Sequence, residues 1–254
     1  MDDHQLLRYS RHILLDELGP DAQERFAAAH ALIVGTGGLG NPAAQFLASA
    51  GIGTLTLVDA DTVDLTNLQR QLLFAMDDVG AAKVDAAARR LSAINPEVHI
   101  VPLRERVGDA ELRRLVAQAG VVLDCTDNFA TRHAINRACV EARTPLVSGA
   151  AIRFDGQLAV FDTRDAASPC YHCLFGEGED LEETRCATMG VFAPLVGIVG
   201  SVQAAEALKL VAGIGTSLAG RLLLVDALAM EWRELRVPRD PGCPVCAQRP
   251  GAPR

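Results

Sequence analysis

The sequence lacks the features that would place this chain in a membrane or on a nucleic acid. No apolar run approaches the roughly 20 residues of a membrane span, because the longest candidate, 190–210, is interrupted by Pro194, Gln203 and Glu206. The acidic N-terminus lacks the basic-then-apolar order of a secretion signal. Basic residues are outnumbered by acidic ones, 24 against 32, and the net charge of −8 argues against a nucleic-acid partner. The sequence therefore predicts a cytoplasmic protein that binds neither membranes nor nucleic acids.

Linkers and low-complexity segments are also absent from the 254 residues, of which 49% are hydrophobic. Such a chain can bury a sizeable core as a single domain, here residues 1–254. Residues 1–30 have helical spacing, residues 31–155 alternate apolar strands with helical segments, and residues 156–254 are richer in strand-like segments. The alternation predicts an α/β fold, namely a doubly wound, mainly parallel, Rossmann-like sheet with a C-terminal strand-rich elaboration. The predicted strands are 31–35, 54–59, 99–103, 121–125, 146–148, 157–161, 221–225 and 231–237, and the predicted helices are 41–50, about 80–94, 109–119, 129–142 and 195–212.

Seven cysteines occur in a chain predicted to be cytoplasmic, where thiols stay reduced and disulfides are not expected. Four of them form two CxxC pairs, Cys170 with Cys173 and Cys243 with Cys246. Two such pairs supply the four soft ligands of a closed tetrahedral zinc site. We therefore expect a structural zinc ion that ties the C-terminal tail to the middle of the chain. Two unrelated pairs or a redox dithiol are the alternatives.

A glycine-rich turn follows the first predicted strand. Residues 35–40 read Gly-Thr-Gly-Gly-Leu-Gly, the GxGxxG spacing, at the start of a predicted helix, where backbone N–H groups bind anions. Asp59 ends the next apolar segment, close to the spacing at which an acid meets a ribose hydroxyl. These features alone predict only a nucleotide, and an NAD-dependent dehydrogenase is one interpretation of them.

Cations and an amide follow this ribose-type acid. Asn67, Arg70 and Lys83 suit a triphosphate better than a nicotinamide, although each cation taken singly is typical of a solvated surface. Asp127 follows a predicted buried strand, where a carboxylate near a triphosphate is suited to hold Mg²⁺, and capping the next helix is its alternative role. Asp127 and the ribose-type acid should face the same crevice, with Asp61 as a second carboxylate nearby.

Several motifs occur together in a fixed order along the chain. They are Arg8-Tyr9-Ser10-Arg11, the glycine-rich turn, Asn67-Leu68-Gln69-Arg70-Gln71, Lys83, Cys125-Thr126-Asp127-Asn128, Ser148-Gly149-Ala150-Ala151, residues 190–197 and the two CxxC pairs. In this combination the chain resembles the ThiF/MoeB/HesA adenylyltransferases, the bacterial relatives of the ubiquitin-activating enzymes. The resemblance covers roughly residues 5–248.

The resemblance implies a reaction. ATP and the C-terminal glycine of a small ubiquitin-like sulfur carrier ending in Gly-Gly would give an acyl-adenylate and pyrophosphate, and the activated carboxylate would then become a thiocarboxylate. Residues 31–155 would form the nucleotide-binding core, and residues 156–254 the zinc-clasped part that binds the carrier. No rhodanese-like extension follows Arg254, so we expect a separate sulfur donor of the cysteine desulfurase or rhodanese type.

The resemblance also implies roles for single residues. Arg70 and Lys83 would hold phosphates, Asp59 the ribose, and Asp127 the magnesium ion. Arg11 would reach into the neighbouring subunit's site, which implies a homodimer. Its distance upstream in the sequence assigns it no role by spacing, so a surface salt bridge is the default interpretation and a mobile arginine finger the alternative. The other residues implied to contact the nucleotide are Gly38, Asp61, Asn67, Leu68, Gln69 and Asn128.

Two questions stay open at this level. Cys186 resembles the family's thioester or persulfide cysteine, but it follows the polar, acidic loop 176–184 and is equally compatible with an incidental thiol. The pathway is the second question, and we favour the molybdopterin type over the thiamine type. Residues 148–153 and 190–194 favour the former, and residues 9–16 and 242–246 the latter.

A nucleotide-regulated adaptor without activity is a third interpretation of the chain, beside the adenylyltransferase and the dehydrogenase.

Overall fold

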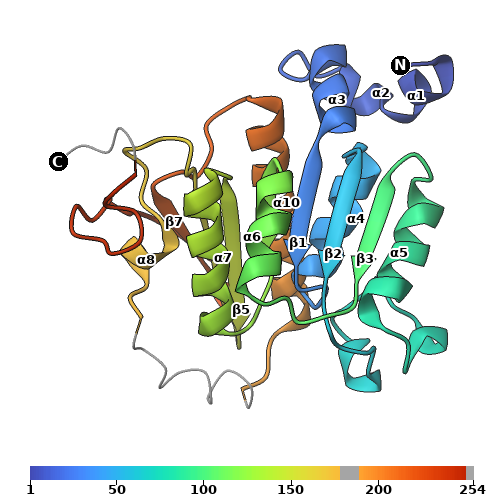
Figure 1. Cartoon of the computed structure of the whole chain (residues 1–254). Helices are drawn as coiled ribbons and strands as arrows, with labels where there is room; N and C mark the ends of the chain where they lie inside the picture. The colour runs from blue at the N-terminus through green and yellow to red at the C-terminus, as the bar shows by residue number, and fades with distance from the viewer. Residues whose placement is uncertain (178–188, 250–254) are drawn as a thin grey trace.

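Eight strands form one continuous sheet in the computed structural model, which describes residues 1–177 and 189–249 (Figure 1). The strand order is β3-β2-β1-β4-β5-β6-β7-β8. Strands β1 to β5 run parallel, and β6 to β8 continue the sheet as an antiparallel end. This confirms the predicted α/β class with its strand-rich C-terminal elaboration. The strands are β1 His30–Val34, β2 Thr54–Val58, β3 His99–Leu103, β4 Val121–Asp124, β5 Leu146–Ile152, β6 Asp155–Phe161, β7 Arg221–Asp226 and β8 Glu231–Arg236.

Helices cover both faces of the sheet (Figure 1). One face packs against α4 (Gly40–Ala50), α5 (Lys83–Ile94) and α10 (Ala193–Ala212), and the other against α6 (Asp109–Gln118) and α7 (Phe129–Ala142). Strands β1 and β4 are buried along nearly their whole length, as expected for parallel strands covered on both sides. The strand order reverses beside β1, where β2 lies on one side and β4 on the other. In doubly wound folds ligands bind at this reversal, outside the carboxyl ends of the strands.

Helix α10 is apolar on all sides. Among the described residues it is the one helix whose length and composition could cross a membrane, with a mean hydropathy of 1.5 over a window that is 56% buried. It packs against α4, β5 and β6. Its Gln203 is fully buried and donates from Nε2 to the carbonyl oxygens of Asp124 and Val147, at 2.8 and 3.2 Å. In this fold the apolar stretch therefore serves as a core helix.

Three short helices precede the sheet and lie at the amino ends of its parallel strands (Figure 1). Tyr9, between the first two, accepts a hydrogen bond from Asn95 Nδ2 at 2.9 Å and donates to Glu97 Oε2 at 3.0 Å, just before β3. Its ring covers Gly51, where an added Cβ would lie 2.7 Å from the hydroxyl oxygen. The N-terminal helices are thereby anchored to the amino edge of the sheet. They are α1 Asp3–Arg8, α2 Ser10–Ile13 and α3 Gly19–Ala28.

Two predicted boundaries differ from the structure by three residues or more. The helix expected from about residue 80 begins at Lys83, because Ala82 is extended and forms a bridge with Thr62. The strand expected at 146–148 runs on to Ile152, because it pairs with β6 in a tight hairpin along its whole length. The remaining short elements are η1 Leu65–Asn67, η2 Met76–Asp78 and α8 Tyr171–Leu174.

Candidate functional site

The glycine-rich turn joins β1 to α4 and packs tightly against the loop after β4. Gly35 has φ +92°, and a Cβ there would lie 2.6 Å from the carbonyl oxygen of Cys125. A Cβ on Gly40 would lie 2.0 Å from the carbonyl oxygen of Gly35. Gly38 faces α10, where its Cβ would lie 3.1 Å from Val196. A side chain is therefore excluded at Gly35 and at Gly40, and the backbone of the turn stands at the N-terminus of α4, a place suited to an anion.

Asp59, directly after β2, is tied to this turn. Its Oδ2 accepts hydrogen bonds from the backbone N–H and the hydroxyl of Thr36, at 2.8 and 3.0 Å. Its Oδ1 accepts from the N–H of Asp61 at 2.9 Å. Asn41 holds the turn from the other side, donating to the carbonyl oxygen of Thr36 at 2.7 Å and accepting from the N–H of Leu73 at 2.8 Å. The acid and the turn thus form one hydrogen-bonded unit.

The two predicted phosphate-binding cations have partners within the chain. Lys83 Nζ lies 2.9 Å from Asp61 Oδ2, and the lysine side chain is 8% exposed whereas that of Asp61 is 57% exposed. Arg70 Nη1 donates to the carbonyl oxygen of Thr66 at 3.0 Å. The ammonium group is therefore held below the surface by a carboxylate that reaches solvent. Of the other predicted contacts in this segment, Asn67 and Leu68 are half-buried and Gln69 is exposed.

Asp127 is exposed in the loop between β4 and α7. Its alternative role as a helix cap belongs instead to Asn128, whose Oδ1 accepts from the N–H of Thr131 at 2.9 Å. Strands β2 and β4 both flank β1, so Asp59 and Asp127 lie at the same edge of the sheet, as predicted. We call the turn 35–40, Asp59, segment 61–83 and loop 125–128 the carboxyl-edge site.

Sequence reasoning missed a buried polar network beneath this loop. Asp124, fully buried at the end of β4, accepts from the N–H and hydroxyl of Thr126, at 3.0 and 2.7 Å, and from Ser148 Oγ at 2.7 Å. Arg132 donates to the carbonyl oxygen of Thr126 at 2.6 Å. Burial opposes the charge of Arg132, but nearby acidic groups, Asp124 foremost, outweigh it and raise the pKa of the guanidinium. The sequence signal that could have revealed this network is Asp124 itself, an acidic residue at the end of an otherwise apolar strand.

Arg11 is not part of the carboxyl-edge site of its own chain. It is exposed on α2, which lies at the amino edge of the sheet, the opposite edge from Asp59 and Lys83 (Figure 1). The apolar side chains of Leu7, Leu14 and Leu15 are exposed on and beside the same helices. Arg11 could therefore meet such a site only in a second copy of the chain.

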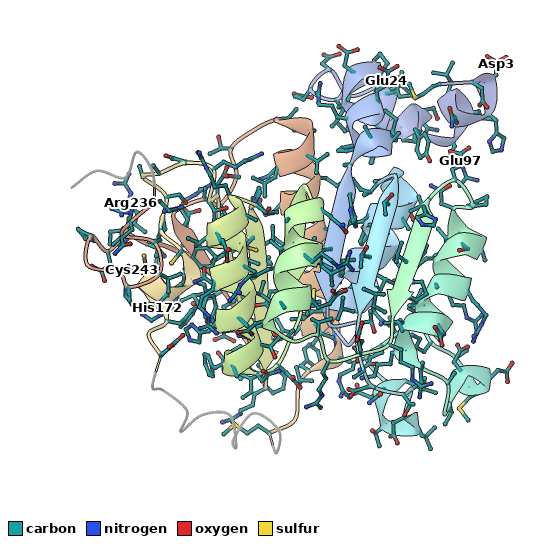
Figure 2. The ribbon with its side chains drawn as sticks, in the orientation of Figure 1. Asp3, Glu24, Glu97, His172, Arg236 and Cys243 are labelled. Carbon is teal, nitrogen blue, oxygen red and sulfur yellow. The ribbon has the colours of Figure 1, made fainter. Side chains whose placement is uncertain are left out.

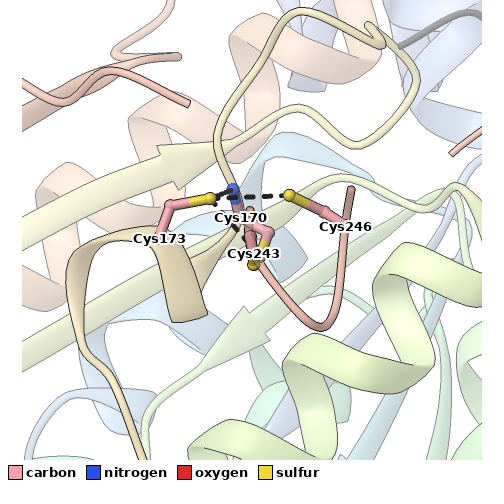
Figure 3. Close-up of side chains that lie close together, drawn as sticks. All are labelled: Cys170, Cys173, Cys243 and Cys246. Carbon is pink, nitrogen blue, oxygen red and sulfur yellow. Dashed lines mark hydrogen bonds between the residues drawn. The ribbon is translucent and has the colours of Figure 1, made fainter. Parts of the chain in front are cut away.

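The four cysteines of the CxxC pairs converge, although 73 residues separate the paired segments (Figure 3). The Sγ atoms of Cys173 and Cys246 are 3.5 Å apart, those of Cys170 and Cys243 3.7 Å, and those of Cys170 and Cys173 3.9 Å. Zinc–sulfur bonds of about 2.3 Å in a tetrahedron place sulfurs about 3.8 Å apart. We call this group the cysteine clasp, and its spacing fits a zinc ion.

Hydrogen bonds around the cysteine clasp favour one thiolate, that of Cys173, which in turn raises the pKa of Cys170, while burial raises the pKa of Cys246. The interaction with the Cys170 sulfur, together with hydrogen bonds from the backbone N–H groups of Cys170 and Asp240, lowers the pKa of Cys173 to about 4. Asn136 Nδ2 points at the sulfur of Cys170, 3.6 Å away. Thiolates are the form that binds zinc, so the donor set agrees with the spacing.

Cys186 and most of the acidic loop 176–184 lie outside the described residues. Glu177, within the described part, pairs with Arg137 of α7 at 2.5 Å. The predicted role of Cys186 therefore stays a prediction.

Comparisons with known proteins extend over the whole chain. The sequence model of the ThiF family matches residues 9–245. Molybdopterin-synthase adenylyltransferase of Escherichia coli is 48% identical over 251 residues, covering 98% of this chain and 99% of that protein. The sulfur carrier protein ThiS adenylyltransferase of Escherichia coli is 47% identical over 246 residues, covering 97% of each. A crystal structure of E. coli MccB with ATP superimposes with a TM-score of 0.82 at 25% identity, covering 95% of this chain and 75% of that one.

Proposed function

We propose that this chain, which belongs to the ThiF family, adenylates the C-terminal glycine of a molybdopterin-synthase-type sulfur carrier. Adenylation of a sulfur carrier is the activity of the family relatives that match it along nearly their full length. That near-complete match at 48% identity is the observation that carries the proposal. The same match argues against the NAD-dependent dehydrogenase, because relatives that share the chain along nearly its full length are adenylyltransferases.

The choice of carrier is the finer part of the proposal. The molybdopterin-type and thiamine-type relatives are 48% and 47% identical to the chain, so overall identity favours neither. We choose the molybdopterin type on residues 148–153, in β5 and the turn after it, and on residues 190–194, which lead into α10. A thiamine-type carrier is the alternative substrate of the same reaction.

The carboxyl-edge site supplies what this reaction needs. The carrier carboxylate must approach a negatively charged α-phosphate, so catalysis depends on charge neutralisation and positioning. Lys83 and Arg70 would turn from Asp61 and from the carbonyl of Thr66 to the phosphates. The backbone of the turn 35–40 would receive phosphate oxygens at the N-terminus of α4. On this proposal the backbone that binds ATP is already formed, and only the side chains of Lys83 and Arg70 change their partners.

Asp59 and Asp127 would bind the sugar and the metal. Asp59 retains lone pairs after its bonds to Thr36 and could accept a ribose hydroxyl. Asp127 is exposed because Asn128 caps α7, and one carboxylate with phosphate oxygens is a suitable set for Mg²⁺. The metal would neutralise charge on the phosphates as the carboxylate attacks.

Arg11 would act from the partner subunit of a homodimer. Its place at the amino edge of the sheet and the exposed Leu7, Leu14 and Leu15 beside it support an interface there. Mixing Arg11→Ala with Lys83→Ala protein tests this. If Arg11 acts in trans, hybrid dimers contain one complete site, and activity should recover to about a quarter of the wild-type value. No recovery in verified hybrid dimers would contradict the proposal.

The cysteine clasp would hold zinc as a structural ion, and residues 156–254 would bind the carrier. Sulfur would come from a separate donor of the cysteine desulfurase or rhodanese type, acting in the cytoplasm. Cys186 is proposed as a candidate covalent residue in that later step, and Cys186→Ser should leave adenylation intact while lowering thiocarboxylate formation.

Pyrophosphate exchange against purified carriers is the direct test. The protein is incubated with ATP, Mg²⁺ and either a molybdopterin-type or a thiamine-type carrier ending in Gly-Gly. Fast exchange with the first carrier is expected, and a carrier lacking its last glycine is the control. Faster exchange with the thiamine-type carrier would transfer the assignment to that pathway, and no exchange with any carrier would leave the adaptor interpretation.

A further inference from the structure

A second group of metal-binding side chains lies beside the cysteine clasp. His133 comes from α7, His172 from α8, and Glu177 follows α8. One ligand atom of each lies within 4.8 Å of the others. His133 is buried, His172 is half-buried and Glu177 is exposed, so the group reaches from the core to the surface. Figure 2 labels His172 and Cys243 at the same end of the molecule.

The spacing is close to that of a bound ion. His133 Nδ1 lies 3.9 Å from a carboxylate oxygen of Glu177. Zinc bonds to nitrogen and oxygen of about 2.1 Å place tetrahedral ligand atoms about 3.4 Å apart. For this pair, closing the gap needs a shift of roughly half an ångström, within the reach of an exposed glutamate, and the ligand atom of His172 lies within 4.8 Å of both. Nδ1 of His172 is buried and has no hydrogen-bond partner among the described residues, which is uncommon for a buried polar atom.

Ring packing explains only part of this arrangement. The His133 ring is edge-on to Tyr171 at 5.3 Å and to His172 at 5.6 Å, so aromatic contacts account for the proximity of the rings. They do not account for a carboxylate facing a buried imidazole nitrogen. Two imidazoles with one carboxylate are a ligand set that holds zinc with one position open.

Arg137 competes with an ion for Glu177. Its guanidinium contacts the Glu177 carboxylate, and the two side chains are 44% and 54% exposed. A solvent-exposed pair of this kind contributes little to stability, so an incoming cation can displace the arginine from the carboxylate. The competition predicts a site that is weaker than the cysteine clasp and that tightens when Arg137 is removed.

We propose that His133, His172 and Glu177 form a second divalent-metal site, of zinc type, with its fourth position open to water or an added ligand. The ion joins α7 to the chain segment that follows α8. His133 lies five residues after Asn128, roughly 7 Å along α7 from the cap beside the carboxyl-edge site. The second site therefore lies on the helix that begins just after the loop carrying Asp127. The site stands independently of the proposed enzymatic function.

Zinc binding to the full chain tests the proposal. Protein with a filled cysteine clasp is dialysed against increasing free Zn²⁺, and bound metal is counted per chain before and after a mild chelator. We expect a second, chelator-labile zinc. His172→Phe, which keeps a ring in place, should weaken the second zinc by more than about tenfold while the first zinc stays. His99→Ala, on exposed β3, is the matched control and should retain both ions.

Two exposed positions separate metal binding from altered packing. Glu177→Gln removes a ligand without touching the ring cluster and should weaken the second zinc. Arg137→Gln removes the competitor and should tighten it several-fold. A chain that takes up only one zinc, or a second zinc unaffected by both His172→Phe and Glu177→Gln, would overturn the proposal. Weaker binding in Arg137→Gln would also count against it.

Discussion

The carboxyl-edge site and the cysteine clasp are assembled in opposite ways. The first collects residues from one continuous half of the chain, and the pairing of β1 with β2 and β4 sets their positions. Its two cations already have protein partners, Lys83 in Asp61 and Arg70 in the carbonyl oxygen of Thr66. The clasp joins segments 73 residues apart, and its sulfurs are brought together at Sγ–Sγ distances of 3.5 and 3.7 Å. The first is therefore organised before any ligand arrives, whereas the second depends on an ion to neutralise clustered thiolates.

Removing the ion from the cysteine clasp should have the largest effect on stability. Cys243→Ser should lose the zinc and lower the free energy of unfolding by about 4 kcal/mol or more, the range in which loss of a bound metal falls. Metal analysis and urea unfolding check this. Cys139→Ser, a buried cysteine of α7 outside the clasp, should keep its zinc. Full zinc content in Cys243→Ser would remove the contrast drawn above.

Removing a cation from the carboxyl-edge site should affect the rate and leave the fold intact. Lys83→Ala should lower adenylation by about 10²- to 10³-fold, as for other charge-stabilising groups. The unfolding transition should hardly move, because Asp61 becomes an exposed, solvated acid. Pyrophosphate exchange and thermal unfolding, measured together, separate the two effects. Arg113→Ala, an exposed cation paired with Glu141 on the other face, is the control and should stay active.

Disrupting the network beneath the loop 125–128 should have an effect of intermediate size. Asp124→Asn keeps the shape but exchanges an acceptor for a donor facing Thr126 N–H and Ser148, so a cost of about 1–3 kcal/mol in unfolding free energy is expected. The displaced loop should also weaken Mg²⁺ binding, which would be measured as a higher Mg²⁺ concentration for half-maximal exchange. Ser148→Ala removes one donor and should show the smaller loss. Equal losses of unfolding free energy in the two variants would contradict the inference that Asp124 is the acceptor on which the network depends.

Acid should act on the carboxyl-edge site through Asp78, and this effect is the smallest. Burial alone would raise the pKa of Asp78, but the N–H of Ala75 and the guanidinium groups of Arg90 and Arg89 outweigh it and hold the pKa below the usual value. A lowered folded-state pKa contributes stability above about pH 4, which is lost as pH falls through that pKa. Asp78→Asn should therefore differ from wild type at pH 6 and converge with it in stronger acid. Urea unfolding at both pH values provides the measurement, and a constant difference would be the contrary result.

The fold was predictable where periodicity is local. Predicted helix 129–142 and predicted strand 99–103 coincide with α7 and β3, because the apolar spacing lies within the segments themselves and a capping residue, Asn128, directly precedes the helix. Strand β5 was underestimated, since Gly149 and two alanines carry little strand preference and only pairing with β6 extends it. Boundaries thus failed where a neighbouring strand decided them.

The sequence predicted which residue types form the candidate sites, but it predicted less well which side chains contact one another. The four cysteines announce a tetrahedral site by spacing alone. The pairing of Lys83 with Asp61 depends on side-chain geometry that no linear pattern contains. His133 and His172 lie far apart in sequence on different helices, so their meeting with Glu177 had no sequence signal.

By itself, the sequence determined the α/β class, the glycine-rich turn, the acid after the second strand and the cysteine pairs. Each of these follows from residue chemistry within a few positions, which is the range over which backbone conformation is set. The tertiary structure alone decided which charges meet, that the helix carrying Arg11 lies at the opposite edge of the sheet from the carboxyl-edge site, and that a histidine pair lies beside the cysteine clasp. Such contacts join residues distant along the chain, and only the packed sheet and its helices bring them within the few ångströms over which hydrogen bonds and metal ligation act.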